Sequence, residues 1–222
     1  MSSQPYFTTD LFDFLVRLKR NNRREWFLKN KARYEAVIKE PCIRFVCDAA
    51  EPLQSISPHL RSDPRSSLFR VYRDIRFSSD KRPYKTHVGM QFSHGGGGKD
   101  VHAPGYYLHL EPGQCFVCGG IWQPDRLALL KVRESIVAKP DAWKKAVRGL
   151  TLSDEDKLSR PPRGFPCDHP LMEDLKRKSF IALIDLNEKQ ICGKSFMSDF
   201  TKSTKKIAPL VEFLARALEM KW

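Results

Sequence analysis

The sequence predicts an α+β fold in which a central antiparallel sheet is flanked by N-terminal and C-terminal helices. Two observations lead to this prediction. Apolar residues recur at helical spacing towards both ends of the chain, whereas the middle third contains short runs with β-rich or alternating composition. A strong turn signal, Glu111-Pro112-Gly113-Gln114, separates two of these runs.

The N-terminal part is expected to be helical. A first helix is predicted over residues 11–20, because its leucines and phenylalanines form one apolar stripe, and the Asn21-Asn22 pair ends it. A second helix is predicted over residues 24–38. Pro41 suits the first turn of a third helix.

Strands and C-terminal helices follow in order. The predicted strands cover residues 68–77, 86–92, 106–110, 115–121 and 180–186. Helices are expected after Pro124 and over residues 141–148, 171–178 and 205–220.

Composition limits the compartment and the partners. The 222 residues carry 39 Lys and Arg against 26 Asp and Glu, a net charge of +13, which favours anionic partners. The first residues contain no apolar run like that of a signal peptide, and no stretch is long enough to span a membrane. We therefore expect a cytoplasmic protein with no membrane partner and with six reduced cysteines.

The segment from Arg70 to Lys85 has the densest charge. On a regular strand, Val71 and Ile75 would face the core, and Arg73 would lie on that same apolar side. A buried arginine needs a carboxylate partner or a bulge that turns it outward. In either case Arg73 would differ from the other residues on that side of the strand, which are apolar.

Three interpretations of this segment stay open. In the first, it binds phosphate or carboxylate, because arginine presents a planar donor fork to both anions. In the second, it is a structural ion-pair network, and in the third it holds a metal. Two carboxylates without a histidine are a poor ligand set, so no metal or other cofactor is predicted. The predicted ligand-binding residues are Arg70, Arg73, Arg76, Lys81, Tyr84 and Lys85, and the carboxylates that orient them or act as bases are Asp74 and Asp80.

A second candidate group lies on the strand before the turn. Tyr107, His109 and Glu111 alternate onto one face, where a histidine and a glutamate two residues apart suit proton transfer or help to hold a metal. The alternative is a polar, solvated sheet face. His109 and Glu111 are the predicted proton-transfer residues, because histidine titrates near neutral pH without help.

The segment from Arg17 to Arg33 offers a different partner. It holds eight Lys and Arg and one Glu, a local charge of 8 − 1 = +7, interrupted by Trp26 and Phe27. Bases could stack on exposed aromatic rings beside such cations. The alternative is that the rings belong to the core and the cations form a solvated face.

Several strings resemble one family. The longest is RDIRFSSDKRPYKTH, residues 73–87, and Trp26-Phe27, residues 105–113 and residues 162–165 add to it. Together they resemble a bacterial and fungal family of conserved hypothetical proteins, a domain of unknown function. The resemblance implies a single domain over residues 1–222 and implies no activity.

The function predicted first is therefore the binding of a small anionic or phosphorylated ligand by the segment from Arg70 to Lys85, with or without catalysis. The second is nucleic-acid binding by the segment from Arg17 to Arg33. The third is a non-catalytic interaction module. A concave pocket would favour the first function, and a broad basic face with exposed aromatic rings the second.

Overall fold

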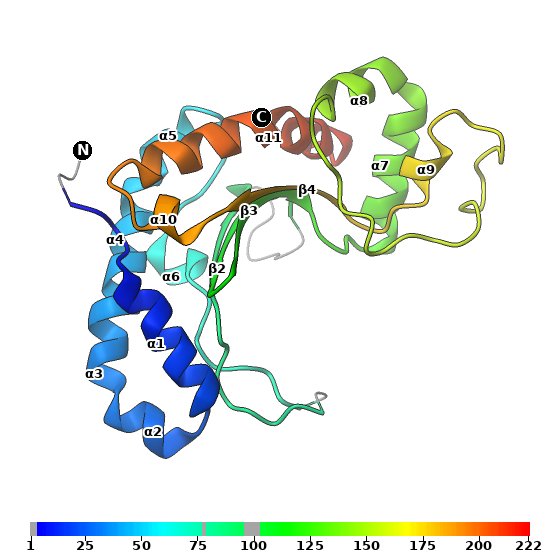
Figure 1. Ribbon diagram of the computed structural model, residues 1–222. Coiled ribbons are helices and arrows are strands. Elements are labelled where there is room, and N and C mark those ends of the chain that lie inside the picture. Colours follow the sequence, from blue (N-terminus) through cyan, green and yellow to red (C-terminus); the bar gives the residue numbers. More distant parts are fainter. Residues whose placement is uncertain (1–3, 77–78, 96–102) are drawn as a thin grey trace.

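A four-stranded antiparallel sheet forms the middle of the protein, with helices before and after it along the chain (Figure 1). The computed structural model describes residues 4–76, 79–95 and 103–222. The arrangement confirms the α+β class predicted from the sequence.

The N-terminal helices form because their apolar residues share one face. In α1 (Thr9–Arg20) that face is buried. The helical segments that follow are α2 (Arg24–Lys29), α3 (Lys31–Tyr34), η1 (Glu35–Lys39), α4 (Glu40–Asp48), α5 (Ala50–Gln54) and α6 (Pro64–Ser67). The predicted second helix is interrupted at Asn30. Pro41 lies in the first turn of α4, as predicted, although α3, η1 and α4 follow one another without a gap. The π-helical segment η1 lies directly before α4, where Pro41 has no N–H to donate to a carbonyl of the preceding turn.

The strands lie in sequence order across the sheet. They are β1 (Val88–Ser93), β2 (Gly105–Glu111), β3 (Gln114–Ile121) and β4 (Phe180–Leu186), and each overlaps a predicted strand. Gly113 closes the β2–β3 turn at φ +78°, a conformation that favours glycine. The register sets His109 opposite both Gly89 on β1 and Phe116 on β3.

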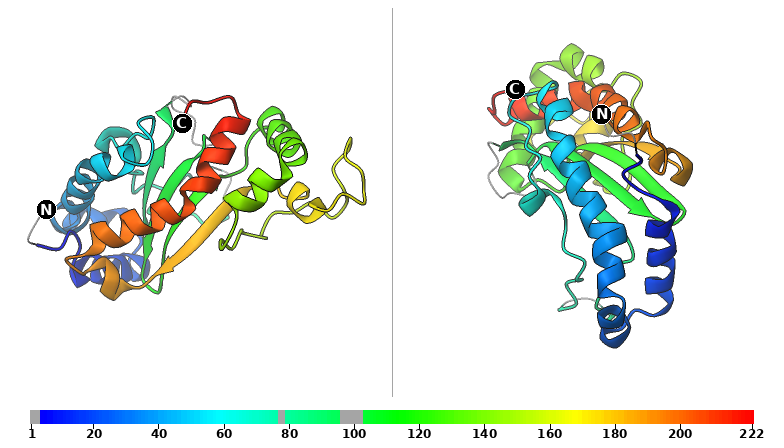
Figure 2. Two further views of the ribbon diagram at one scale, coloured as in Figure 1. Left: turned by 90° about the horizontal axis from the view of Figure 1, so that it is seen from above. Right: turned by 90° about the vertical axis from the view of Figure 1, so that its left-hand side faces the viewer.

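The last of the C-terminal helices, in chain order, covers one face of this sheet. The C-terminal helices are α7 (Arg126–Ala138), α8 (Pro140–Ala146), α9 (Met172–Leu175), α10 (Glu188–Ile191) and α11 (Phe196–Ala217). Figure 2 shows α11 crossing the sheet diagonally. Gly119 permits this close approach, because a Cβ atom there would lie 2.7 Å from Ile207 of α11. None of the described helices is both long enough and apolar enough to cross a bilayer.

The last helix begins earlier than predicted. The sequence predicted it over residues 205–220, whereas α11 starts at Phe196 and continues through Pro209. Tertiary contacts explain the earlier start. Phe196 and Phe200 both pack on Phe45 of α4, with ring centroids 5.2 Å apart in each pair. These contacts extend the buried side of the helix by two turns.

The strand predicted over residues 68–77 is wrong. Phe77 lies outside the described residues, and the remainder is extended but forms only isolated bridges, Leu68 with Met90 and Tyr72 with Tyr84. Residues 71–73 pair instead with residues 83–85 of the same segment, through Arg73 N–H to Pro83 O (3.0 Å) and Lys85 N–H to Val71 O (2.8 Å). We call residues 70–85 the arm, which lies on the opposite side of the sheet from α11 (Figures 1 and 2).

The base of the arm is clamped to the N-terminal helices. The side-chain amide of Asn22 donates to Tyr84 O (2.9 Å) and accepts from Tyr84 N–H (3.0 Å), as a neighbouring strand would. The Tyr84 ring is 2% exposed and stacks on Phe27, with centroids 4.2 Å apart. Tyr84, predicted as a ligand-binding residue, thus has a core environment and positions the chain on either side of it.

Candidate functional site

The sheet has one packed face and one open face. On the packed face, Tyr106 is 1% exposed and Val117 is 0% exposed. On the other face, Tyr107 and Cys118 are half-buried and Leu183 is 38% exposed, and the register makes these three neighbours. Figures 1 and 2 show the arm on this side and none of the described helices over it. Of the three neighbours on this face, Leu183 on β4 is therefore exposed, and Tyr107 and Cys118 are partly so.

Two histidines and a glutamate meet on the open face. His87 lies one residue before β1, and His109 and Glu111 lie on β2. Their ligating atoms all lie within 4.8 Å of one another, and the two imidazole centroids are 4.6 Å apart. His109 Nε2 is 3.4 Å from Glu111 Oε2. As the alternation on β2 predicted, His109 and Glu111 share a face, and the β1–β2 register adds His87 to them.

Neighbouring groups hold this cluster in place. Tyr107 Oη lies 3.1 Å from His109 Nδ1, on the side of the ring away from Glu111. Thr86 Oγ1 donates to Glu111 Oε1 at 3.2 Å. The ring of Phe116 stacks on His109 with a centroid distance of 4.8 Å and an interplanar angle of 5°. Each of these contacts restricts the rotation of a cluster side chain.

A glycine makes room for the cluster. A Cβ atom on Gly89 would lie 2.5 Å from Tyr107 Oη, so the tyrosine ring occupies the space above β1 that a side chain would fill. Glycine weakens a strand interior, and its presence there usually marks a close approach of another group. Here the approaching group is the ring that contacts His109.

Burial sets the protonation state of both imidazoles. Burial lowers the pKa of His87 to about 4, and the neighbouring His109 adds to this shift. Burial also lowers the pKa of His109, although the Glu111 carboxylate opposes that change. Both rings are thus neutral near pH 7, the form that accepts protons and binds metals.

The carboxylates of the arm are occupied by arginines. Asp74 accepts from the backbone N–H and the guanidinium of Arg76, and Asp80 accepts from the same two groups of Arg82. Arg73 also binds Asp80, at 2.5 Å, and this is the carboxylate partner that the sequence analysis required. The hydrogen bonds from the arginines lower the pKa of both aspartates, which makes them weak bases. Asp74 and Asp80 therefore fit the ion-pair interpretation better than a catalytic one.

The other predicted cations of the arm are not paired with carboxylates. Within the described residues, Arg70 is exposed and makes no ion pair, and Lys81 donates to Ile75 O at 3.0 Å. Lys85 is half-buried, with Nζ 5.1 Å from the centroid of the Phe69 ring. Burial lowers the pKa of Lys85, and the nearby Arg70 lowers it further.

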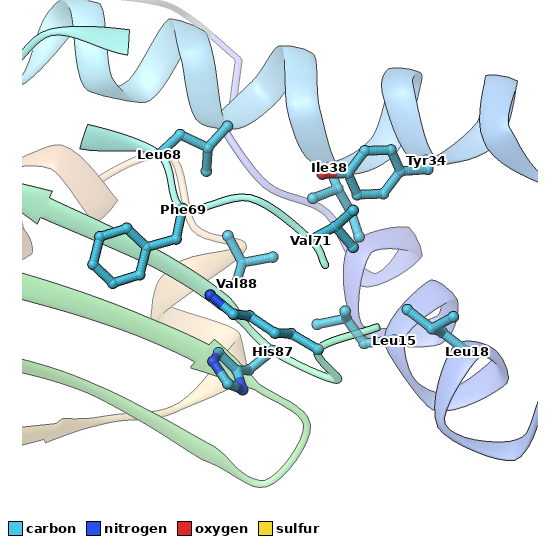
Figure 3. A pocket seen from close by; sticks show the side chains of 10 residues that line it. Leu15, Leu18, Tyr34, Ile38, Leu68, Phe69, Val71, His87 and Val88 are labelled. Carbon is cyan, nitrogen blue, oxygen red and sulfur yellow. The ribbon is translucent and has the colours of Figure 1, made fainter. Parts of the chain in front are cut away.

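A small apolar pocket adjoins the cluster (Figure 3). Its lining residues are Leu15, Leu18, Tyr34, Ile38, Leu68, Phe69, Val71, Lys85, His87 and Val88. The free volume of about 10 Å³ is at the limit for one water molecule and far below that of a ligand pocket. A ligand of the predicted kind therefore does not fit in this pocket.

The basic segment from Arg17 to Arg33 presents part of one aromatic ring, since Trp26 lines an open hollow with Arg23, Glu25 and Lys29. Trp26 is half-buried and packs on Phe14, and Phe27 is buried against Tyr84. Most of the cations around them are exposed. The alternative of core rings and a solvated cationic face thus describes Phe27 and most of the cations, whereas Trp26 is only partly buried. Nucleic-acid binding by this segment stays a prediction.

The sequence analysis did not select His87 or Thr86. Both lie at the end of the string of residues 73–87, directly after Lys85, the last of its predicted ligand-binding residues. The missing signal was the pairing register, because Val88 lies opposite Leu110 and the preceding residue therefore faces Glu111. Alternation along one strand cannot reveal a neighbour on another.

The fold and the site together define an α+β protein with a polar histidine–glutamate cluster on a bare sheet face. The chain belongs to the family of conserved hypothetical proteins DUF2461, which it matches over residues 10–213. The resemblance noted in the sequence is thereby confirmed at the family level. No curated protein and no solved structure matches this chain.

Proposed function

We propose that the protein binds a small anionic ligand, of the phosphate or carboxylate type, on the open sheet face between the arm and the His87–His109–Glu111 cluster. The observation that supports this most directly is the ammonium group of Lys85. It is half-buried and has no carboxylate partner among the described residues. A buried charge without a partner is costly, and an anion would remove that cost.

The surroundings of Lys85 favour the same ligand. Arg70 is close enough to lower the pKa of Lys85, so two cations repel each other at this point. Three arginines of the arm, Arg73, Arg76 and Arg82, already pair with its two aspartates, Asp74 and Asp80. Arg70 and Lys85, at the base of the arm, have no such carboxylate among the described residues, so positive charge stays uncompensated there.

The base of the arm adjoins the polar cluster. The Phe69 ring beneath the ammonium group lies 5.8 Å from the ring of Tyr107, which in turn contacts His109. An anion at Lys85 would thus have a neutral imidazole and a carboxylate on its other side. In this proposal any proton transfer is carried out by His109 and Glu111, because the aspartates of the arm are held by arginines.

Thermal unfolding with phosphate tests the proposal. At ten times the dissociation constant, phosphate should stabilise the protein by about 1.4 kcal/mol, since it binds only the folded state. For a chain of this size that is a rise in Tm of about 3–6 °C. Potassium chloride at equal ionic strength controls for screening, and a chelator removes any metal.

Two lysine variants separate a local site from general positive charge. Lys85→Met should abolish the phosphate effect. Lys81→Met removes the same charge from the same arm but away from the cluster, and should leave the effect intact. A wild-type protein indifferent to phosphate, or an equal loss in the two variants, would overturn the proposal.

A further inference from the structure

The His87–His109–Glu111 cluster has the composition of a metal centre. Two imidazoles and one carboxylate form a ligand set used for zinc and for non-haem iron. Within the described residues, this is the one group of His, Cys, Asp or Glu side chains whose ligating atoms gather so closely, within 4.8 Å. The arm's aspartates, which the sequence analysis considered as ligands, are not part of it.

The separation between His109 and Glu111 suits an ion better than a hydrogen bond. His109 Nε2 and Glu111 Oε2 are 3.4 Å apart, beyond the usual 2.7–3.2 Å of an N–H···O bond. Around a tetrahedral ion with bonds of about 2.1 Å, neighbouring ligand atoms lie about 3.4 Å apart. His87 completes the set, with its ligating nitrogen within 4.8 Å of the other two ligand atoms.

The outer contacts are those that metal ligands require. A ligating histidine uses its second nitrogen in a hydrogen bond, and His109 Nδ1 meets the Tyr107 hydroxyl at 3.1 Å. A ligating carboxylate is itself hydrogen-bonded, and Glu111 Oε1 accepts from Thr86. Phe116 stacks flat on His109 and fixes the plane of the ring. Each partner orients a ligand and leaves a donor atom free for an ion.

From these contacts we propose that His87, His109 and Glu111 bind one divalent transition-metal ion, with an open coordination position towards the bare face of the sheet. Three protein ligands and one open position characterise catalytic rather than structural zinc sites. Metal binding by the cluster does not depend on the proposed function. The binding of the anion to the metal, which we call the ligand step, does rest on it. In that step the anion takes the open position on the metal.

The charges around the cluster support the pairing of metal and anion. Glu111 supplies one negative charge to a doubly charged ion, and its Oε1 lies 3.9 Å from Lys19 Nζ. Lys85 and Arg73 of the arm lie close enough to His87 for their positive charges to lower its pKa. With so many cations present, an anion should strengthen metal binding, and the metal should strengthen anion binding by the same factor.

Metal titration of the untagged, chelator-treated full chain tests the first step without any anion. Zn²⁺ should bind with a stoichiometry of one, and Co²⁺ should give the visible spectrum of a four-coordinate site. His87→Gln and Glu111→Gln should each weaken binding more than about 100-fold, beyond the loss caused by outer partners. Tyr107→Phe, which removes only the hydroxyl, should weaken binding about 10–100-fold.

A matched histidine variant provides the control. His59 is half-buried and lies 5.4 Å from another histidine ring, but it is outside the cluster. His59→Gln should bind zinc as the wild type does. Substoichiometric zinc in the wild type, or equal losses for His59→Gln and His87→Gln, would overturn the inference, as would Glu111→Gln binding zinc normally while folded.

The ligand step is tested with methylphosphonate, which stays soluble with zinc. It should bind more tightly to the zinc-loaded protein than to the chelated protein, and this gain should vanish in Glu111→Gln. Phosphate protection that needs Lys85 and is equally strong with and without stoichiometric zinc would refute the ligand step of the metal inference and retain the proposed function. Stoichiometric zinc without any anion effect would retain the metal site and refute the proposed function.

Discussion

The two hydrogen bonds that clamp Tyr84 to Asn22 should contribute measurably to the stability of the protein. Asn22→Ala removes two hydrogen bonds, of 2.9 and 3.0 Å, to the backbone of Tyr84. Tyr84 is only 2% exposed, so water does not readily replace these bonds. At about 1 kcal/mol net for each bond, the free energy of unfolding should fall by about 2 kcal/mol. For a chain of this length that is a drop in Tm of about 4–8 °C. Urea unfolding followed by tryptophan fluorescence measures the loss.

The neighbouring asparagine is a matched control. Asn21 makes a single exposed side-chain bond, to Arg17 O at 3.0 Å, so Asn21→Ala should cost about 0.5 kcal/mol. Hydrogen exchange at the Tyr84 amide should speed up in Asn22→Ala alone. Phosphate affinity should fall with it, since Lys85 follows Tyr84 directly. Equal losses in the two variants, or an unchanged Tyr84 amide, would refute the reasoning.

Three further predictions concern packing, the arm and the thiols. Gly119→Ala should lower the free energy of unfolding by about 1–3 kcal/mol in urea, because the added Cβ would overpack the interface with α11, 2.7 Å from a core side chain. Arg73→Met should lower it by less than Asn22→Ala does, since the pair with Asp80 is part-exposed and a second arginine holds the same carboxylate. In the folded protein, Cys47 and Cys167 should react fastest with a thiol reagent because they are exposed, and unfolding without reductant should release six thiols.

The opposite outcomes are equally specific. A fully stable Gly119→Ala variant would show that α11 can move away from the sheet at no cost. If Arg73→Met proved the most damaging substitution, the arm would depend on its ion pairs and not on the clamp. Fewer than six thiols after unfolding would reveal a disulfide.

The strands that were predicted correctly are those whose burial follows their own composition. Residues 115–121 alternate between buried and partly exposed positions as far as Gly119, and local sequence records this directly. Residues 180–186 run apolar and form β4, although only Phe180 and Ala182 of them are buried. Residues 68–77 have an alternation like that of residues 115–121, and Arg70, Tyr72, Asp74 and Arg76 are indeed exposed on one side. Yet they form no strand, because a strand needs a partner along its whole length and Asn22 directs the pairing elsewhere.

The sequence by itself determined the α+β class, the family, the excess of positive charge and the shared face of His109 and Glu111. The ion pairs between aspartates and arginines two residues apart in the arm are local contacts, and an ion-pair network was one of the three interpretations that the sequence left open. Only the tertiary structure decided that Tyr84 belongs to the core and that His87 joins the cluster. Both depend on contacts between segments far apart in the chain, the Asn22 clamp and the β1–β2 register, and no local pattern of residue types specifies which distant backbone a segment will meet.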